Sequence, residues 1–387
     1  MAASSTRAGR YVRQPEGFDA FVPAPYPPVD IQLVDNRILD LLTRADRELG
    51  RLVGAAEILP NPDLFVLMYV RREAVLSSQI EGTQASLMDV LEYEAARRAG
   101  ERRVDVDEVS NYVAALRLGL RRVKELPLSL RLIREIHERL MKGVRGGERA
   151  KTPGEFRRSQ NWVGGASPAT ARYVPPPMHE MERALDAFEK ALHEEGGYPL
   201  LVRVGLAHAQ FETIHPFQDG NGRIGRLLVT FLLCQYGILS EPLLYLSIYF
   251  KKHRQEYYDR LQAVRDRGDW EGWLAFFLEG LAVVAAEATA TARRIVTLRE
   301  ELRERITTRL TRRSGTALRL LDKLFKEPVV SVKSVQRLVG YSQPAAGALI
   351  QAMEGAGILS ELTGRRRGRV WEFRPYLRLF GERGLRQ

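Results

Sequence analysis

A glycine-rich segment near the middle of the chain limits the choice of fold more than any other feature of the sequence. Residues 215–226 read HPFQDGNGRIGR and contain the spacing G-x-G-x-x-G. In dinucleotide-binding folds this spacing follows a β-strand. Here the preceding residues, 200–214, place their apolar side chains at helical spacing, so the segment joins two helices. This excludes a Rossmann fold, and the lack of a following Gly-Lys-Ser/Thr excludes a Walker A loop.

The same segment nevertheless has the chemistry of a polyphosphate site. Gly220 and Gly222 allow backbone conformations that bring N–H groups close to a ligand. A helix beginning near Gly222 would direct its positive end at the same point. Arg223 and Arg226 lie three residues apart on that helix and offer forked donors to phosphate oxygens.

Two further residues of the segment bring metal and acid–base chemistry. Asp219 is a hard oxygen ligand that suits Mg²⁺, which proteins usually hold through one or two carboxylates and phosphate oxygens. His215 stands at the entrance of the loop, and a reference pKa of about 6.5 leaves it mostly neutral at pH 7, as a general base must be. Each residue alone has an ordinary structural interpretation, but their convergence on one loop favours a functional one.

The rest of the chain is mostly helical by pattern and divides into five segments. They are an extended arm rich in Pro, Ala and Arg (1–30), a helical region (31–127), a catalytic core (128–280), a connecting helix (281–313) and a C-terminal domain (314–387). The single cysteine, Cys234, excludes a disulfide scaffold and a Cys-based zinc cluster. The N-terminus has no apolar signal segment, so we expect a cytoplasmic protein without a membrane partner.

Two regions break the helical pattern. Residues 154–177 contain too many Gly and Pro for a helix, and strand-like pieces at 161–163 and 172–174 predict an irregular hairpin. In residues 314–387, three helices precede two β-like pieces with a basic tip, which is the order of a winged helix-turn-helix. This domain holds 13 Lys and Arg against 6 Asp and Glu, in a chain with a net charge of +11.

The C-terminal domain and the connecting helix leave alternatives open. The expected recognition helix, Gln343–Gly355, has no Arg or Lys for reading bases. Docking to a protein therefore stands beside DNA binding through the arginines of the wing tip, which are Arg365, Arg366, Arg367 and Arg369. An apolar stripe on the connecting helix fits either packing on the core or a homodimer seam; it consists of Ile295, Leu298, Leu302, Ile306 and Leu310.

Residues 215–226 match the Fic family signature H-P-F-x-[D/E]-G-N-G-R-x-x-R at every fixed position, and the chain resembles Fic proteins over about residues 30–280. The resemblance implies a mainly α fold, with an all-helical core and a short β-hairpin flap, here followed by the winged helix-turn-helix. Most Fic proteins transfer AMP from ATP to a Ser, Thr or Tyr hydroxyl of a target protein. The chain is therefore expected to be a protein adenylyltransferase that uses ATP and Mg²⁺ and also modifies itself.

The resemblance also implies roles for single residues. His215 would deprotonate the target hydroxyl, and Asp219 would hold Mg²⁺ on the α- and β-phosphates. The implied nucleotide-binding residues are Gly220, Asn221, Gly222, Arg223, Gly225 and Arg226 in the motif, Val163, Gly164 and Gly165 in the flap, and Tyr257 and Tyr258 beyond it.

Residues 77–82 read SSQIEG and resemble the inhibitory pattern [S/T]-x-x-x-E-[G/N], which here precedes the Fic motif. The resemblance implies that Glu81 pairs with Arg226 and occupies the place of the γ-phosphate, so that ATP binds in a non-productive pose. Ser77 and Glu81 are four residues apart and share one helical face, and Gly82 completes the pattern. In some relatives the same glutamate also helps to remove AMP.

Two other functions remain open on the sequence. The same scaffold can transfer another nucleotide or a phosphate group, and a DNA-binding regulator can use a Fic core to sense a nucleotide. The expected partners are therefore ATP, a target protein that the sequence does not identify, DNA and a second copy of the chain.

Overall fold

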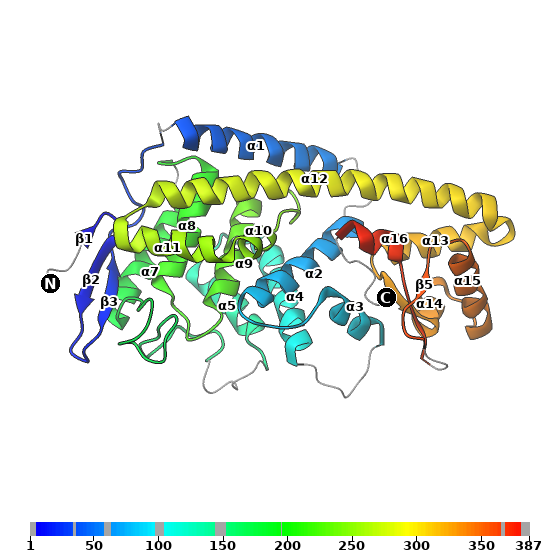
Figure 1. The fold of residues 1–387 in the computed structure, drawn as a ribbon, viewed down its shortest axis with the longest axis horizontal. Helices are drawn as coiled ribbons and strands as arrows, with labels where there is room; N and C mark the ends of the chain where they lie inside the picture. Colours follow the sequence, from blue (N-terminus) through cyan, green and yellow to red (C-terminus); the bar gives the residue numbers. More distant parts are fainter. Residues whose placement is uncertain are drawn as a thin grey trace.

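A computed structural model of the chain describes residues 5–33, 36–57, 63–96, 104–143, 152–194, 196–364 and 368–380. In these residues the fold is mainly helical, with one small antiparallel sheet near each end of the chain (Figure 1). The expected mainly α fold class is confirmed.

The structure has the following elements. The helices are α1 (Asn36–Glu57), α2 (Asp63–Ile80), α3 (Leu87–Ala96), α4 (Val104–Arg122), α5 (Leu130–Leu140), α7 (Met178–His193), α8 (Leu200–Ile214), α9 (Asn221–Gln235), α10 (Ser247–Lys252), α11 (Arg254–Arg267), α12 (Trp270–Arg309), α13 (Ser314–Leu324), α14 (Val332–Val339), α15 (Gln343–Gly355) and α16 (Arg374–Leu377). The strands are β1 (Ser5–Thr6), β2 (Gly9–Arg13), β3 (Asp19–Pro23), β4 (Val329–Ser331), β5 (Ser360–Glu361) and β6 (Val370–Glu372).

Helices α8 and α9 form the centre of the helical region. From Leu201 to the end of α8 every residue except Arg203 is buried, and α9 is buried from Arg223 to Leu233. Helices that are buried on all sides lie in the interior of a protein. Helices α7, α11 and α12 pack on α8, and α2, α4 and α5 pack on α9. The glycine-rich loop between α8 and α9 is therefore held from both ends by the core.

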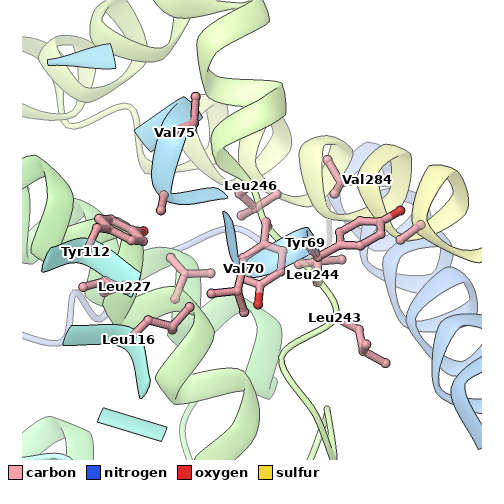
Figure 2. Packing of buried hydrophobic residues seen from close by; sticks show 14 of the residues in the cluster. Tyr69, Val70, Val75, Tyr112, Leu116, Leu227, Leu243, Leu244, Leu246 and Val284 are labelled. Atoms are coloured by element: carbon pink, nitrogen blue, oxygen red, sulfur yellow. The ribbon is translucent and has the colours of Figure 1, made fainter. Parts of the chain in front are cut away.

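Helix α2 belongs to the same core. Figure 2 shows Val70 and Val75 of α2 beside Leu116 of α4, Leu227 of α9 and Leu246, and all five side chains are buried. The C-terminal end of α2 is thereby held next to the first turns of α9.

The longest helix, α12, supports the core along its length. It has 40 residues, and α1 lies along it (Figure 1). By length and composition this helix could cross a membrane, because an 18-residue window of it has a mean hydropathy of 1.5. However, 67% of that window is buried inside the protein. The expected boundary at residues 280/281 is wrong, because it falls inside this continuous helix. Within the apolar stripe, Ile295, Leu302 and Ile306 are buried by the chain's own packing.

The N-terminal residues differ from the expected extended arm. Residues 5–23 form a three-stranded antiparallel sheet in the order β1-β2-β3, with Tyr11 opposite Phe21. Phe21 is fully buried, and its N–H donates to the carbonyl of Val174 at 2.9 Å. Tyr11 donates to Asp266 of α11 at 2.9 Å. The sheet therefore packs beside the region expected to form the flap.

That region, between α5 and α7, has less regular structure than expected. The two strand-like pieces are reduced to one antiparallel bridge between Val163 and Tyr173. The Val163 N–H donates to the Tyr173 carbonyl at 2.8 Å, and Tyr173 donates back at 3.2 Å. The hairpin is therefore closed by a single residue pair.

The C-terminal domain consists of α13, α14 and α15 with a three-stranded sheet in the order β4-β6-β5. The order of three helices and two late strands agrees with the expectation, and β4 is an additional strand between α13 and α14. Gly340 ends α14 in the left-handed region (φ 74°) and starts the turn to α15. The domain also contacts the helical region, because β4 packs against α3 and η2 (Arg378–Phe380) against α12.

Candidate active site

The candidate site begins at the C-terminal end of α8. His215 adopts a left-handed conformation (φ 50°, ψ 58°) as the C-terminal cap of that helix. For a residue other than glycine this conformation is uncommon and is maintained only by surrounding contacts. The His215 carbonyl accepts from Arg157 at 3.1 Å and from Asn161 at 3.2 Å. These contacts fix the backbone from which the imidazole projects.

Asn221 fastens the loop at its other end. Its Oδ1 accepts from the Phe217 N–H at 2.8 Å, and its Nδ2 donates to the Phe217 carbonyl at 2.7 Å. Both side-chain groups are thus engaged within the loop, although Asn221 lies on the wall of the cavity described below. The geometry makes Asn221 a clamp on the loop backbone, whereas the sequence suggested direct contact with phosphate.

The first turn of α9 faces the loop. Gly220 precedes it in the left-handed region (φ 84°) and no side chain caps the helix. An uncapped helix start presents backbone N–H groups and a positive dipole end, which favour an anion. This arrangement is the one predicted from the sequence.

Arg226 on α9 is the best-anchored charge of the site. Its side chain is 2% exposed and donates from Nε to Ser77 Oγ at 2.8 Å and from Nη2 to the Ser77 carbonyl at 2.9 Å. Nη2 also donates to Glu81 Oε1 at 2.7 Å. Burial alone would lower the pKa of Arg226, but the charge and hydrogen bond of Glu81, together with Tyr257 and Tyr258, raise the pKa above its usual value. The structure thus brings Ser77, Glu81 and Arg226 together.

Arg223 has a different environment. It is 5% exposed, and its Nη2 lies 3.6 Å from the Met141 sulfur and 3.6 Å from Asp219 Oδ1. Its Nε is buried without a hydrogen-bond partner among the described residues. Arg223 is absent from the wall of the cavity, so in this conformation it lies behind the loop.

Asp219 is the more exposed partner of this pair. Its side chain is 38% exposed, and Oδ1 accepts from the Gly220 N–H at 2.6 Å. It lies on the cavity wall, as a ligand for a phosphate-bound cation must.

A cavity of about 490 Å³ lies between the loop, the region around Val163 and helix α11. Of the residues expected at the site, its wall includes Glu81, Val163, Gly164, His215, Asp219, Gly220, Asn221, Gly222, Arg226, Tyr257 and Tyr258. Other expected residues do not line it: Ser77, Gly82, Gly165, Arg223 and Gly225. Of these, Ser77 supports the site through Arg226, and Gly225 lies beneath it.

The two tyrosines have unequal environments, as their adjacent positions on a helix require. Tyr257 is 1% exposed and its OH lies 2.8 Å from His208 Nε2, while Tyr258 is half-buried. His208 Nδ1 lies 2.8 Å from the Gly225 carbonyl. Since a carbonyl can only accept, Nδ1 carries the hydrogen, and Tyr257 donates to Nε2.

Glu212, Arg254 and Arg265 also line the cavity, although the sequence analysis did not select them. Arg265 is 7% exposed, donates to the Glu212 carbonyl at 3.1 Å and stacks on the Tyr173 ring at 3.8 Å. Glu212 gave one signal, since it is a charged residue in the last turn of a mostly apolar helix. The two arginines resemble ordinary surface residues of a charged helix.

The pKa values of His215 and Glu212 are shifted in opposite directions. Burial, followed by the positive charge of Arg265, lowers the pKa of His215 to about 4, so it is neutral at pH 7. Burial raises the pKa of Glu212 to about 7. The site therefore pairs a neutral imidazole with a carboxyl group that titrates near neutrality.

Of the four arginines expected at the tip of the wing, the structure describes Arg369. Arg369 forms an ion pair with Glu361, and Arg365, Arg366 and Arg367 lie outside the described residues. DNA binding therefore stays a prediction.

Parts of the chain are similar in sequence to the Fic/DOC family. Residues 127–233 match the Fic/DOC family, and residues 39–121 match the Fic/DOC family N-terminal region. The chain therefore contains both of these Fic/DOC family domains.

Similar proteins agree with this assignment. Protein adenylyltransferase Fic of Aedes aegypti is 36% identical over 154 residues, which are 39% of this chain and 27% of that protein. A probable protein adenylyltransferase of Aquifex aeolicus is 28% identical over 176 residues, 46% of this chain and 51% of that protein. The chain thus spans about a quarter to a half of the length of these relatives.

A solved structure has the same fold over most of the chain. A Fic family protein from Desulfovibrio desulfuricans superposes with a TM-score of 0.58 at 21% identity, covering 90% of this chain and 98% of that one. Fic-1 from C. elegans gives a TM-score of 0.51 at 20% identity, covering 69% and 74%.

Proposed function

We propose that the protein is a protein adenylyltransferase that transfers AMP from ATP to a hydroxyl group of a target protein. One observation carries the proposal: His215, the uncapped start of α9 and Arg226 converge on one cavity. A neutral imidazole, free backbone donors and a fixed positive charge are the groups that phosphoryl-type transfer uses for positioning and charge stabilisation.

His215 is the general base of this proposal. Its Nδ1 lies 3.4 Å from the Glu212 carbonyl, which can only accept, so the hydrogen resides on Nδ1. Nε2 then carries the lone pair that takes the proton from the target hydroxyl. The hydroxyl oxygen bonds to the α-phosphorus as the bond to the β-phosphate breaks, and pyrophosphate leaves.

The phosphates would lie against the loop. The amides at the start of α9 would bind the α- and β-phosphates, and Arg226 the γ-phosphate once Glu81 has moved. Arg223 would need to turn from its place behind the loop to reach them.

Mg²⁺ fits the donor set of the loop. Asp219 supplies one half-exposed carboxylate, and among the described residues no group of three or more His, Cys, Asp or Glu could hold a metal. One carboxylate with phosphate oxygens and water is a usual Mg²⁺ environment. The ion would neutralise phosphate charge, while Asp219 would orient it.

Glu81 inhibits AMP transfer in this proposal. It lies on the cavity wall and holds Arg226 Nη2 at 2.7 Å. ATP can bring its γ-phosphate to that guanidinium only by displacing the carboxylate. In the same proposal Glu81 also assists removal of AMP, so the unsubstituted chain should release AMP from a product made by the Glu81→Gly variant.

The test is transfer of label from α-labelled ATP to protein by the unsubstituted chain, Glu81→Gly and Glu81→Gly/His215→Ala, with γ-labelled ATP as control. We expect label from the α position only, increased by the first substitution and abolished by the second. Competition by unlabelled GTP, UTP and CTP reports which base is accepted. The proposal fails if none of the three proteins transfers label while ATP binding is intact.

A further inference from the structure

Glu212 places a carboxyl group directly behind His215. The residue lies in the last turn of α8 and is 7% exposed. Its Oε2 is 3.8 Å from His215 Nδ1, and it lies on the cavity wall. Its Oε1 is buried without a hydrogen-bond partner among the described residues. Burying a carboxyl in this way costs free energy, so its place in the core needs an explanation.

Helix α9 is shaped to accept this carboxyl. A Cβ atom at Gly225 would lie 2.3 Å from Glu212 Oε1, so any other residue there would require the Glu212 carboxyl to move. The helix thus has a glycine at the point that the carboxyl approaches, which leaves room for the carboxyl beside the imidazole.

We propose that Glu212 is a positioning residue for His215, a carboxylate that orients the Nδ1–H and stabilises the imidazolium formed during AMP transfer. This inference rests on the proposed adenylyltransferase function. It concerns a residue that the sequence analysis did not select.

The proton balance defines what Glu212 does. The target oxygen bonds to the α-phosphorus, the bond from that phosphorus to the β-phosphate oxygen breaks, and the hydroxyl proton moves to His215 Nε2. His215 then carries a positive charge with hydrogen on both nitrogens. The hydrogen on Nδ1 stays there, near two oxygens of Glu212, the carbonyl at 3.4 Å and the carboxylate Oε2 at 3.8 Å from Nδ1. The proton on Nε2 is later released to solvent.

His215 needs such a partner. Burial and Arg265 lower its pKa to about 4, which makes it a weak base near neutral pH. An ionised carboxylate beside Nδ1 opposes this effect, because it favours the charged imidazole. Of the groups on the cavity wall, Glu212 is the carboxyl within ion-pair distance of Nδ1.

The charge state of Glu212 is set by groups on several elements. Burial raises its pKa to about 7, and the nearby charges act in both directions. The groups that face it are Glu81 at the end of α2, Tyr173, His215, Arg226 on α9, and Tyr257 and Arg265 on α11. Glu212 is therefore mostly protonated below pH 7 and ionised above it, and His215 is supported only in the ionised state.

The experiment uses the full chain with Glu81→Gly, so that transfer can be measured. Single-turnover AMP transfer at saturating Mg·ATP is compared for Glu212→Gln, Glu212→Asp and the parent between pH 5.5 and 9. Glu372→Gln is the matched control, since Glu372 is a buried carboxylate in the C-terminal domain (3% exposed). ATP affinity is measured for each protein.

We expect Glu212→Gln to slow transfer ~10–100-fold at pH 8, a share of the ~10²–10⁴-fold that general base catalysis supplies. The transfer rate of this variant should no longer increase as the pH rises through 7, and its affinity for ATP should be unchanged. Glu212→Asp should keep the rise at a reduced rate, and Glu372→Gln should behave as the parent. A parent-like rate and pH profile in Glu212→Gln overturns the inference.

An NMR titration of His215 does not depend on these variants. The ring signal of His215 in the unsubstituted chain should show an inflection near pH 7 from ionisation of Glu212. A flat signal there overturns the inference even if a variant fails to fold. If Glu81→Gly transfers no label, the proposed function has failed, while the titration still decides whether the two residues are coupled.

Discussion

Arg226 shows how a single buried charge is satisfied. Two of its three hydrogen bonds go to Ser77, and the next residue, Ser78, is also buried but its hydroxyl has no partner among the described residues. We expect Ser77→Ala to lower the free energy of unfolding by ~1–3 kcal/mol, because the Arg226 Nε then loses its acceptor. Urea unfolding at pH 7.5 measures the change.

Ser78→Ala is the matched control for this prediction. It removes a buried hydroxyl for which the described part of the chain supplies no hydrogen-bond partner, so stability should be unchanged or higher. Equal destabilisation by both substitutions would mean that Ser77 contributes only packing.

His208 makes stability depend on pH. Burial lowers its pKa to about 3, below the unfolded value of about 6.5. Its stabilising contribution is therefore present above pH 6.5 and is lost as the pH falls toward 3, since only the unfolded chain then binds the proton. We expect His208→Gln to be less stable at pH 7.5, with the gap narrowing by ~2 kcal/mol at pH 5. Urea unfolding at both pH values measures it.

The control is His179→Gln, whose side chain is 70% exposed and solvated in both states. A gap that stays constant between pH 7.5 and pH 5 for His208→Gln would show that the native protein protonates this imidazole.

At the scale of residues, the sequence identified the groups whose chemistry is local. His215, Asp219 and Arg226 stand in one short motif around two glycines, and the structure places all three on the cavity wall. Glu212 and Arg265 could not be found in this way, because their roles arise from the packing of α8 against α11. Spacing along one chain segment does not reveal such contacts.

At the scale of elements, the packing of α4 on α9 depends on one glycine. A Cβ atom at Gly119 would lie 2.2 Å from the Phe231 ring. We expect Gly119→Ala to destabilise the protein by ~1–3 kcal/mol, because overpacking outweighs the helix preference of alanine. Thermal or urea unfolding measures the change.

Gly50 on α1 provides the comparison. A Cβ atom there meets nothing within 4 Å, so Gly50→Ala should stabilise the helix by ~0.5–1 kcal/mol. The two substitutions are chemically identical and differ in surroundings. The packing argument fails if Gly119→Ala is as stable as the unsubstituted chain.

Helices with strong end signals were predictable, and short strands were not. Helix α15 has the expected bounds, Gln343–Gly355, because Ser342 and Pro344 mark its start. Helix α5 begins at Leu130, because Ser129 caps it by accepting from the Leu132 N–H. The N-terminal sheet was missed, since its strands have at most five residues and stand among prolines. Their pairing depends on contacts with Val174 and α11.

At the scale of the whole molecule, the C-terminal domain rests on the helix that leads to Glu81. Tyr69 of α2 packs edge-on against Phe380 with ring centroids 5.3 Å apart. Arg71, 7% exposed, donates to the Lys326 carbonyl at 3.1 Å and pairs with Glu94 of α3 at 2.7 Å. Glu81 and the C-terminal domain are therefore attached to the same helix, α2.

This contact gives a prediction about protection from hydrogen exchange. Arg71→Met keeps a long side chain but removes the hydrogen bond from Arg71 to the Lys326 carbonyl. A buried hydrogen bond of this kind contributes ~1–3 kcal/mol, so amides from the end of α13 through β4 should exchange ~10-fold faster or more. Arg337→Met is the control, because its ion pair with Glu327 is half-exposed and contributes at most ~1 kcal/mol. If both variants keep full protection, Arg71 does not hold the domain on α2, and the attachment must come from the rings of Tyr69 and Phe380.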